Sequence, residues 1–148
     1  MPLNSSIDQD LKTALLSGDK LRATTLRSLK SAIVYAEVAE GARQTGLSDV
    51  AIISVISQQS KKRQESADIY LKAGATARAN QELAEKQIID NYLPAQLTEP
   101  EINKFIDDAM VEMGSDKPAM GQIIALVKQK TVGKADGAVI ARLVKDKL

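Results

Sequence analysis

A proline inside an otherwise helical pattern limits how this chain can fold. The segment "NYLPAQLTEPE" carries Pro94, whose ring blocks continuation of a helix and biases Leu93 toward an extended backbone. Apolar residues follow helical spacing before this point and again after it. The sequence therefore predicts an N-terminal helical domain over residues 1–93 and a C-terminal domain over residues 94–148.

Helical periodicity runs through both predicted domains, and no convincing strand alternation is visible. Glycines and polar caps divide the pattern into four helices before the proline and three after it. Thr98 with Glu101 forms a capping box for the fifth helix, and Pro118 suits the first turn of the sixth. The predicted fold is all-α, with a four-helix N-terminal bundle and a three-helix C-terminal bundle.

The first helix is predicted from a local start signal. Ser5 and Asp8 resemble a capping box, and Ile7, Leu11 and Leu15 follow at four-residue spacing. These three side chains are expected to face the core.

Composition excludes several classes of chemistry. The chain has no cysteine and no histidine, so it can form no disulfide, thiolate nucleophile or imidazole base, nor a metal site that needs them. We expect no catalytic residue, no metal and no cofactor. No apolar run approaches the ~20 residues of a membrane span, and no signal peptide is visible, so we expect a cytoplasmic protein without a membrane partner.

Positive charge is concentrated near the C-terminus. The net charge of the chain is only +1, which gives no global attraction to nucleic acid, and DNA is not an expected partner. Residues 128–148, however, hold six basic and two acidic residues. The candidates for RNA binding are Lys128, Lys130, Lys134, Arg142 and Lys145. Aromatic residues make up 3% of the chain, so contacts would be mainly to phosphates.

The segment "GKADG" lies inside this basic region. It is not a phosphate-binding Walker loop, because no strand precedes it and Ala135 follows the lysine. The spacing instead predicts a corner between two helices, with Gly133 left-handed at the end of one and Asp136 capping the next. Gly137 would allow a close backbone approach, and Lys134 would face solvent.

A second polar segment, "QQSKKRQ", lies in the middle of the long third helix. Gln59, Arg63 and Ser66 continue a helix face that is apolar at its start, and the candidate polar patch consists of Gln59, Lys62 and Arg63. A solvated section of helix is the favoured interpretation. The alternative is a polar patch that binds a phosphate or a carboxylate of a partner.

Carboxylates cluster on the fifth predicted helix at Asp107, Asp108 and Glu112. Pairs at helical spacing can bind a hard cation or act as acid and base. Because these residues alternate with ordinary polar residues on an amphipathic helix, a solvated face is favoured.

Several motifs together resemble a known family. The segments "KKRQESADIYLKAG", "NYLPAQLTEPEI", "MGQII" and "VGKADGAVIARLV" resemble the GatB/YqeY family, in particular its stand-alone YqeY-like members. The likeness covers nearly the whole chain. The residues that carry the motifs at their turns are Tyr92, Leu93, Pro94, Gly121, Gly133, Asp136 and Gly137. Departures from the family pattern are Ala75, Arg78, Ala119 and Gln122.

The resemblance implies a fold and a function. It implies two helical bundles, the second similar to the tail of the B subunit of glutamine-dependent aminoacyl-tRNA amidotransferase, which helps to hold tRNA. YqeY-like proteins are often labelled as carbon–nitrogen ligases with glutamine as amido-N-donor, a label that we interpret as inherited from the shared tail.

Three functions follow from these features. The favoured hypothesis is an accessory protein that binds tRNA and has no catalytic centre of its own. An amidotransferase or its subunit is the second, although glutamine hydrolysis needs an activated nucleophile with its base. The third is an adaptor that binds a translation-related protein through the polar middle of the third helix.

Overall fold

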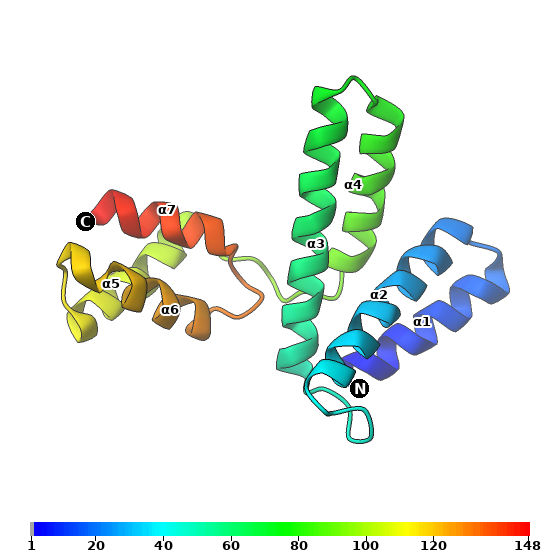
Figure 1. Ribbon diagram of the computed structural model, residues 1–148, viewed down its shortest axis with the longest axis horizontal. Helices are drawn as coiled ribbons and strands as arrows, with labels where there is room; N and C mark the ends of the chain where they lie inside the picture. The colour runs from blue at the N-terminus through cyan, green and yellow to red at the C-terminus, as the bar shows by residue number, and fades with distance from the viewer. Residues whose placement is uncertain (1) are drawn as a thin grey trace. The chain divides into compact units, whose positions relative to one another are not determined.

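The structure is a computed structural model that describes residues 2–148, and over this range the chain is all-α, as predicted. It contains seven α-helices, one 3-10 turn and no strand within these residues (Figure 1). The elements are α1 (Leu3–Ser17), α2 (Lys20–Ala39), α3 (Asp49–Lys72), α4 (Thr76–Asp90), α5 (Glu99–Met113), the 3-10 turn η1 (Lys117–Ala119), α6 (Met120–Lys130) and α7 (Gly137–Lys147). The contacts divide the chain into two compact units, Met1–Leu93 and Pro94–Leu148.

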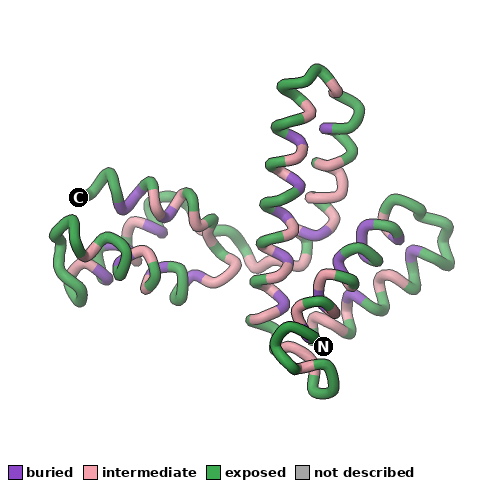
Figure 2. Tube along the Cα trace, viewed as in Figure 1, coloured by how far each residue is buried: buried purple, intermediate pink, exposed green. Residues whose placement is uncertain are grey.

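The first unit is built from two helical hairpins. α1 and α2 run side by side, as do α3 and α4 (Figure 1). Gly18 and Gly74 have φ of 76° at the two tight turns, a left-handed conformation that glycine adopts without steric cost. The buried side chains of this unit's core are Ile7, Leu26, Leu29, Ile33, Ile52, Ile56 and Ile89. They lie on the helix faces that turn toward one another (Figure 2).

The predicted start of the first helix is wrong. α1 begins at Leu3 after Pro2, with no side-chain cap, so Ser5 lies inside the helix. The Leu3 amide instead donates to Oδ1 of Asp49 at 3.2 Å. Asp49 begins α3, so a contact from a distant helix takes the place of the local cap.

The predicted buried face of α1 is also partly wrong. Ile7 is buried and Leu11 half-buried, but Leu15 is 51% exposed and Ala14 is buried instead. Each four-residue step rotates a side chain by about 40°, so two steps carry Leu15 off the face that Ile7 occupies, whereas a seven-residue step returns close to it.

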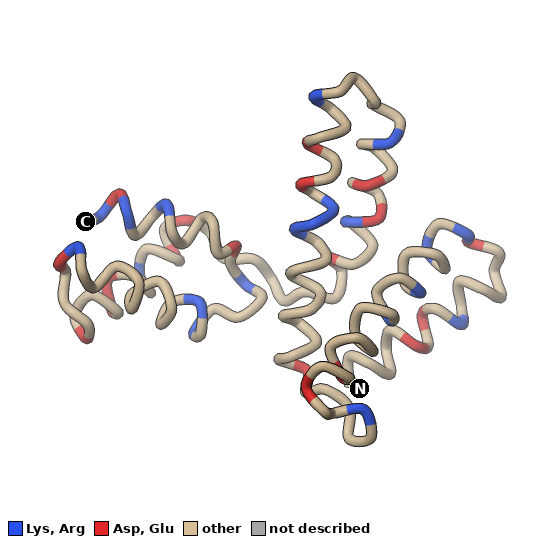
Figure 3. Tube along the Cα trace, in the orientation of Figure 1, with Lys and Arg blue, Asp and Glu red and all other residues tan. Residues whose placement is uncertain are grey.

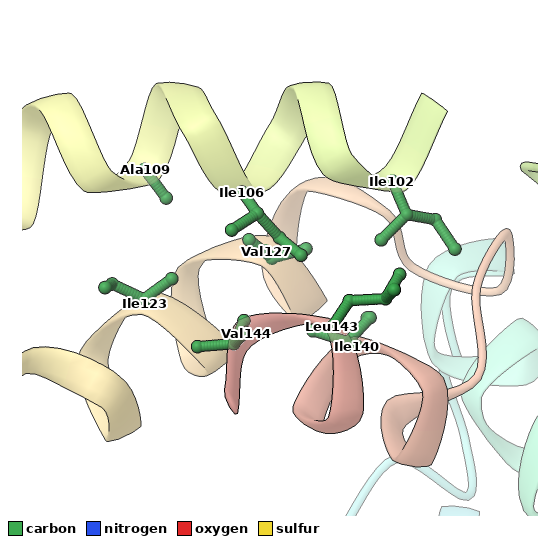
Figure 4. Packing of buried hydrophobic residues seen from close by; sticks show 8 residues of the cluster. All are labelled: Ile102, Ile106, Ala109, Ile123, Val127, Ile140, Leu143 and Val144. Atoms are coloured by element: carbon green, nitrogen blue, oxygen red, sulfur yellow. The ribbon is translucent and has the colours of Figure 1, made fainter. Parts of the chain in front are cut away.

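The second unit is a small three-helix core. Side chains from α5, α6 and α7 converge in its centre (Figure 4). The buried residues are Ile102, Ile106, Ala109, Ile123, Val127, Ile140, Leu143 and Val144. α5 begins with the capping box of Thr98 and Glu101, in which side chain and backbone bond in both directions. Pro118 lies in η1 rather than in the first turn of α6.

Tyr92 connects the end of α4 to the α1–α2 hairpin. Together with Leu93 it packs against the core of the first unit. Its hydroxyl donates to Oδ2 of Asp10, which also lies 3.8 Å from Nη2 of Arg22. Burial, and then the bond and the charge of Asp10, raise the pKa of Tyr92 well above its ordinary value of 10, while Arg22 acts in the opposite direction.

The Tyr92 network predicts a change of stability at high pH. The fold favours the neutral phenol, so its contribution is complete below pH 10 and declines above it, where the unfolded chain ionises first. Tyr92→Phe should cost about 1–2 kcal/mol at pH 8, as a lost hydrogen bond to a charged acceptor does. The difference in free energy of unfolding between the unsubstituted protein and Tyr92→Phe should decrease above pH 10, by at most about 1.4 kcal/mol per pH unit. Urea unfolding from pH 8 to 11 measures this difference, and a constant difference would contradict the assignment.

Candidate nucleic-acid interface

The "GKADG" segment forms the corner between α6 and α7. Thr131 follows the last residue of α6, and its buried hydroxyl donates to the carbonyl of Val127 at 2.7 Å. Gly133 has φ of 73°, in the left-handed region. Asp136 caps α7, since its Oδ1 accepts a hydrogen bond of 2.8 Å from the Ala138 amide. The backbone of the corner is therefore well defined.

The linker that precedes α5 is bound to this corner. Nε2 of Gln96 donates to the Gly133 carbonyl at 2.7 Å, and the Leu97 amide donates to the Lys134 carbonyl at 2.7 Å. Gln96 and Leu97, at the end of the motif "YLPAQL", thus contact the motif "GKADG" some forty residues later within the second unit. This pairing could not be predicted, because neither motif contains a periodic pattern that points to the other.

Gly137 makes room for a lysine rather than for a backbone. A Cβ atom at this position would lie 2.9 Å from Cε of Lys128 and 3.2 Å from its Nζ. The prediction that Gly137 allows a close backbone approach is therefore wrong, because the atoms next to it belong to the Lys128 side chain. The side chain of Lys128 passes over the first residue of α7 and brings its charge to the corner.

Figure 3 marks the charged residues of the chain, and the basic residues between positions 128 and 148 fall into two groups by their ion pairs. The other two basic residues of the second unit, Lys104 and Lys117, are exposed and form no ion pair within residues 2–148. Arg142 pairs with Glu99 and lies 4.0 Å from Asp146, and Nζ of Lys130 lies 4.0 Å from Oε2 of Glu112. Lys147, which was not among the candidates, pairs with Asp107. The other three candidates are exposed and form no ion pair within residues 2–148: Lys128, Lys134 and Lys145.

These three lysines span the length of α7. Lys128 and Lys134 lie at the corner, where α7 begins. Lys145 comes eight residues after Gly137, or about 12 Å along a helix with a rise of 1.5 Å per residue. The structure thus places two free ammonium groups near one end of α7 and one near the other.

The polar segment of α3 differs from the solvated section that the sequence favoured. Lys62 is exposed and Gln59 half-buried, but Arg63 is only 8% exposed. Nε of Arg63 lies 3.5 Å from Oε2 of Glu85 on α4, and its Nη2 donates to Oγ of Ser28 on α2 at 3.5 Å. Arg63 therefore connects three helices inside the first unit, and the carboxylate nearest to it belongs to the same chain.

A second polar cluster joins α3 to α4. The buried Ser60 hydroxyl donates to Oδ1 of Asp90 at 2.5 Å, and Nζ of Lys86 donates to Oδ2 at 2.7 Å. A shallow, open depression beside it is lined by Gln64, Leu83, Lys86, Gln87, Asp90 and Asn91. The bonds satisfy both oxygens of Asp90, so this cluster is explained as a tie between the two helices.

Other expected features are placed as follows. Gly121 is exposed in the first turn of α6, with open space where a Cβ would lie, so packing does not require a glycine there. Among residues 2–148 no group of three or more acidic side chains is arranged to hold a metal ion. None of the described helices has the length and apolar character needed to span a membrane.

Comparison with known proteins decides the family. The family model described as "Yqey-like protein" matches residues 4–148. The chain belongs to the YqeY-like family.

Three curated relatives share the name "Altered inheritance of mitochondria protein 41, mitochondrial". The protein of Lachancea thermotolerans is 30% identical over 119 residues, which cover 78% of this chain and 62% of the relative. That of Vanderwaltozyma polyspora is 28% identical over 115 residues, covering 74% and 61%. That of Eremothecium gossypii is 35% identical over 89 residues, covering 60% and 48%. The chain of this YqeY-like protein thus spans less than two thirds of each relative's length.

These relatives correct one expectation. The sequence led us to expect a cytoplasmic protein, but the three relatives are named as mitochondrial proteins. The cytoplasmic prediction is therefore wrong. It depended on the lack of a visible targeting segment, which is weak evidence about location.

The corner predicts contrasting effects of two neighbouring substitutions. Asp136→Ala removes the cap of α7 and should lower the free energy of unfolding by about 0.5–2 kcal/mol. Lys134→Ala should change it by less than about 0.5 kcal/mol, because Lys134 takes part in the corner through its backbone amide and carbonyl, which the substitution keeps. Chemical denaturation of both variants tests this. Equal losses would mean that the lysine side chain has a structural role.

Proposed function

We propose that this YqeY-like protein is an accessory protein that binds tRNA through its second unit and has no catalytic centre of its own. The observation that carries the proposal is that three exposed lysines around and along α7, Lys128, Lys134 and Lys145, form no ion pair with any of residues 2–148. The resemblance of this unit to the tail of an amidotransferase B subunit supports tRNA as the partner.

The charge distribution supports phosphate contacts rather than base readout. The second unit contains eight basic and eight acidic residues, so attraction to RNA must come from its free cations. Phe105, the only aromatic residue of the unit, is partly buried against the core, so stacking on bases can contribute little. Binding of this kind depends on backbone shape and salt concentration rather than on sequence.

The two alternatives have less support. A carbon–nitrogen ligase would need a nucleophile activated by a base, and the chain contains neither cysteine nor histidine. An adaptor that uses the middle of α3 would lose its strongest cation, because Arg63 is buried against Glu85. Failure of RNA binding would favour the adaptor, since Lys61 and Lys62 remain exposed on α3.

We also propose that the four-helix and three-helix parts are separate bundles that fold independently. Each unit has its own cluster of buried aliphatic residues, and Pro94 lies at the boundary between them. A fragment of residues 1–93 should retain its helical circular dichroism and a cooperative thermal transition. An unfolded fragment, alongside a stable full-length chain, would show that the first part needs the second.

RNA binding predicts a defined salt dependence. The full-length protein should bind unfractionated tRNA, with an affinity that falls as salt rises from 50 to 200 mM. Lys134→Ala should weaken binding and reduce the slope of log K against log salt by about one, since one phosphate contact is lost. Lys128→Ala and Lys145→Ala should act alike. Lys62→Ala, which removes an exposed lysine from the first unit, is the matched control and should leave the slope unchanged.

The decisive negative result is simple. If no tRNA binds above background at 50 mM salt, where phosphate contacts are strongest, the three lysines are ordinary solvated side chains.

A further inference from the structure

The carboxylates of α5 lie against basic residues of the other two helices in the second unit. Glu99 pairs with Arg142 and Asp107 with Lys147, both on α7. Glu112 lies 4.0 Å from Lys130, at the end of α6. Three of the six basic residues between positions 128 and 148 therefore face an acidic group of the same chain.

We propose that three carboxylates of α5, Glu99, Asp107 and Glu112, are internal competitors for the anionic partner and restrict the phosphate contacts of residues 128–148 to three lysines. The proposal rests on RNA binding by the second unit. It specifies, in addition, which cations of this unit do not contact the RNA. A cation that faces a carboxylate presents a pair with a net charge near zero. A phosphate must either displace that carboxylate or meet the pair without net attraction.

The covalent chain gives the carboxylate an advantage over the phosphate. Exposed ion pairs typically contribute about 0–1 kcal/mol to folding, so these pairs are expected to have little effect on the stability of the second unit. A carboxylate on the same unit nevertheless competes at a high effective concentration, because its approach to the cation is intramolecular. Arg142, the residue best suited to bidentate phosphate binding, is the clearest case, since Glu99 and Asp146 flank it.

The proposal has a numerical consequence. Each neutralised phosphate contributes about 0.9 to the salt slope for a duplex, so contacts from three lysines predict a slope of about −2.7. If all six basic residues made contacts, the slope would be about −5.4. The two values differ enough to be separated in a titration series.

The test removes the competitors one at a time in the full-length chain, with unfractionated tRNA as the probe. Asp107→Asn should free Lys147, increase the magnitude of the slope by about 0.9 and tighten binding roughly five- to tenfold at 0.1 M salt. Glu99→Gln should act in the same direction through Arg142 but with a smaller change, because Asp146 remains 4.0 Å from Arg142. Because the two changes lie at different turns of α5, Asp107→Asn still gives a result if Glu99→Gln disturbs the start of the helix, which circular dichroism would reveal.

Asp108→Asn is the matched control. Asp108 is exposed on the same helix, and within residues 2–148 it forms no ion pair, so its removal changes the net charge without freeing a cation. The slope of log K against log salt for Asp108→Asn should equal that of the unsubstituted protein. The double variant Glu99→Gln/Arg142→Gln should also return to the original slope, because the freed cation is then absent.

The outcomes separate this inference from RNA binding itself. If the unsubstituted protein binds tRNA but Glu99→Gln and Asp107→Asn behave like Asp108→Asn, the competitor role is wrong and RNA binding stands. If tRNA binds to the two variants but not to the unsubstituted protein, three lysines do not suffice for binding, and the proposal that the unsubstituted protein binds tRNA fails. If none of the proteins binds tRNA at 50 mM salt, both proposals fail.

Discussion

Two hydrogen bonds between the linker and the corner organise the second unit. The Gln96 side chain and the Leu97 amide donate hydrogen bonds to the carbonyls of Gly133 and Lys134. Without these bonds the two carbonyls would have no partner in the turn. The capping box at Thr98 follows directly, so the start of α5 is held at the point where α6 turns into α7. The aliphatic side chains of the three helices then meet in register (Figure 4). The position of the lysines around the corner follows from this arrangement of the backbone.

Charged residues serve different purposes in the two units. In the first unit they lie inside or beside the core. Arg63 contacts Glu85, Asp10 accepts from Tyr92, and the buried Glu37 accepts from Arg43 at 2.8 Å. Breaking such a pair leaves a buried charge without compensation, which is costly. In the second unit the ion pairs are at the surface, where such pairs contribute little to folding.

Features that depend on neighbours in the sequence were predictable. The capping box at Thr98 and the cap at Asp136 involve residues within three positions of each other, so their patterns are visible in the chain itself. Helical spacing likewise identified the all-α class. Two of the failures involve contacts between distant residues: Asp49 replaces the predicted cap at Ser5, and Glu85 draws Arg63 out of solvent. The division of the basic residues into paired and free depends mainly on carboxylates of α5 that lie 18 to 43 residues away in the sequence.

The contact between Gly137 and Lys128 has a consequence for how such a surface can evolve. An alanine at position 137 would collide only with the far end of a flexible side chain, and the first turn of a helix tolerates alanine well. The protein would keep its fold while the ammonium group moved to another place at the corner. A single methyl group added at position 137 could thus move the charge of Lys128 without a large loss of stability, so mutation at this site can change the charged surface of the corner while selection for folding has little effect on it.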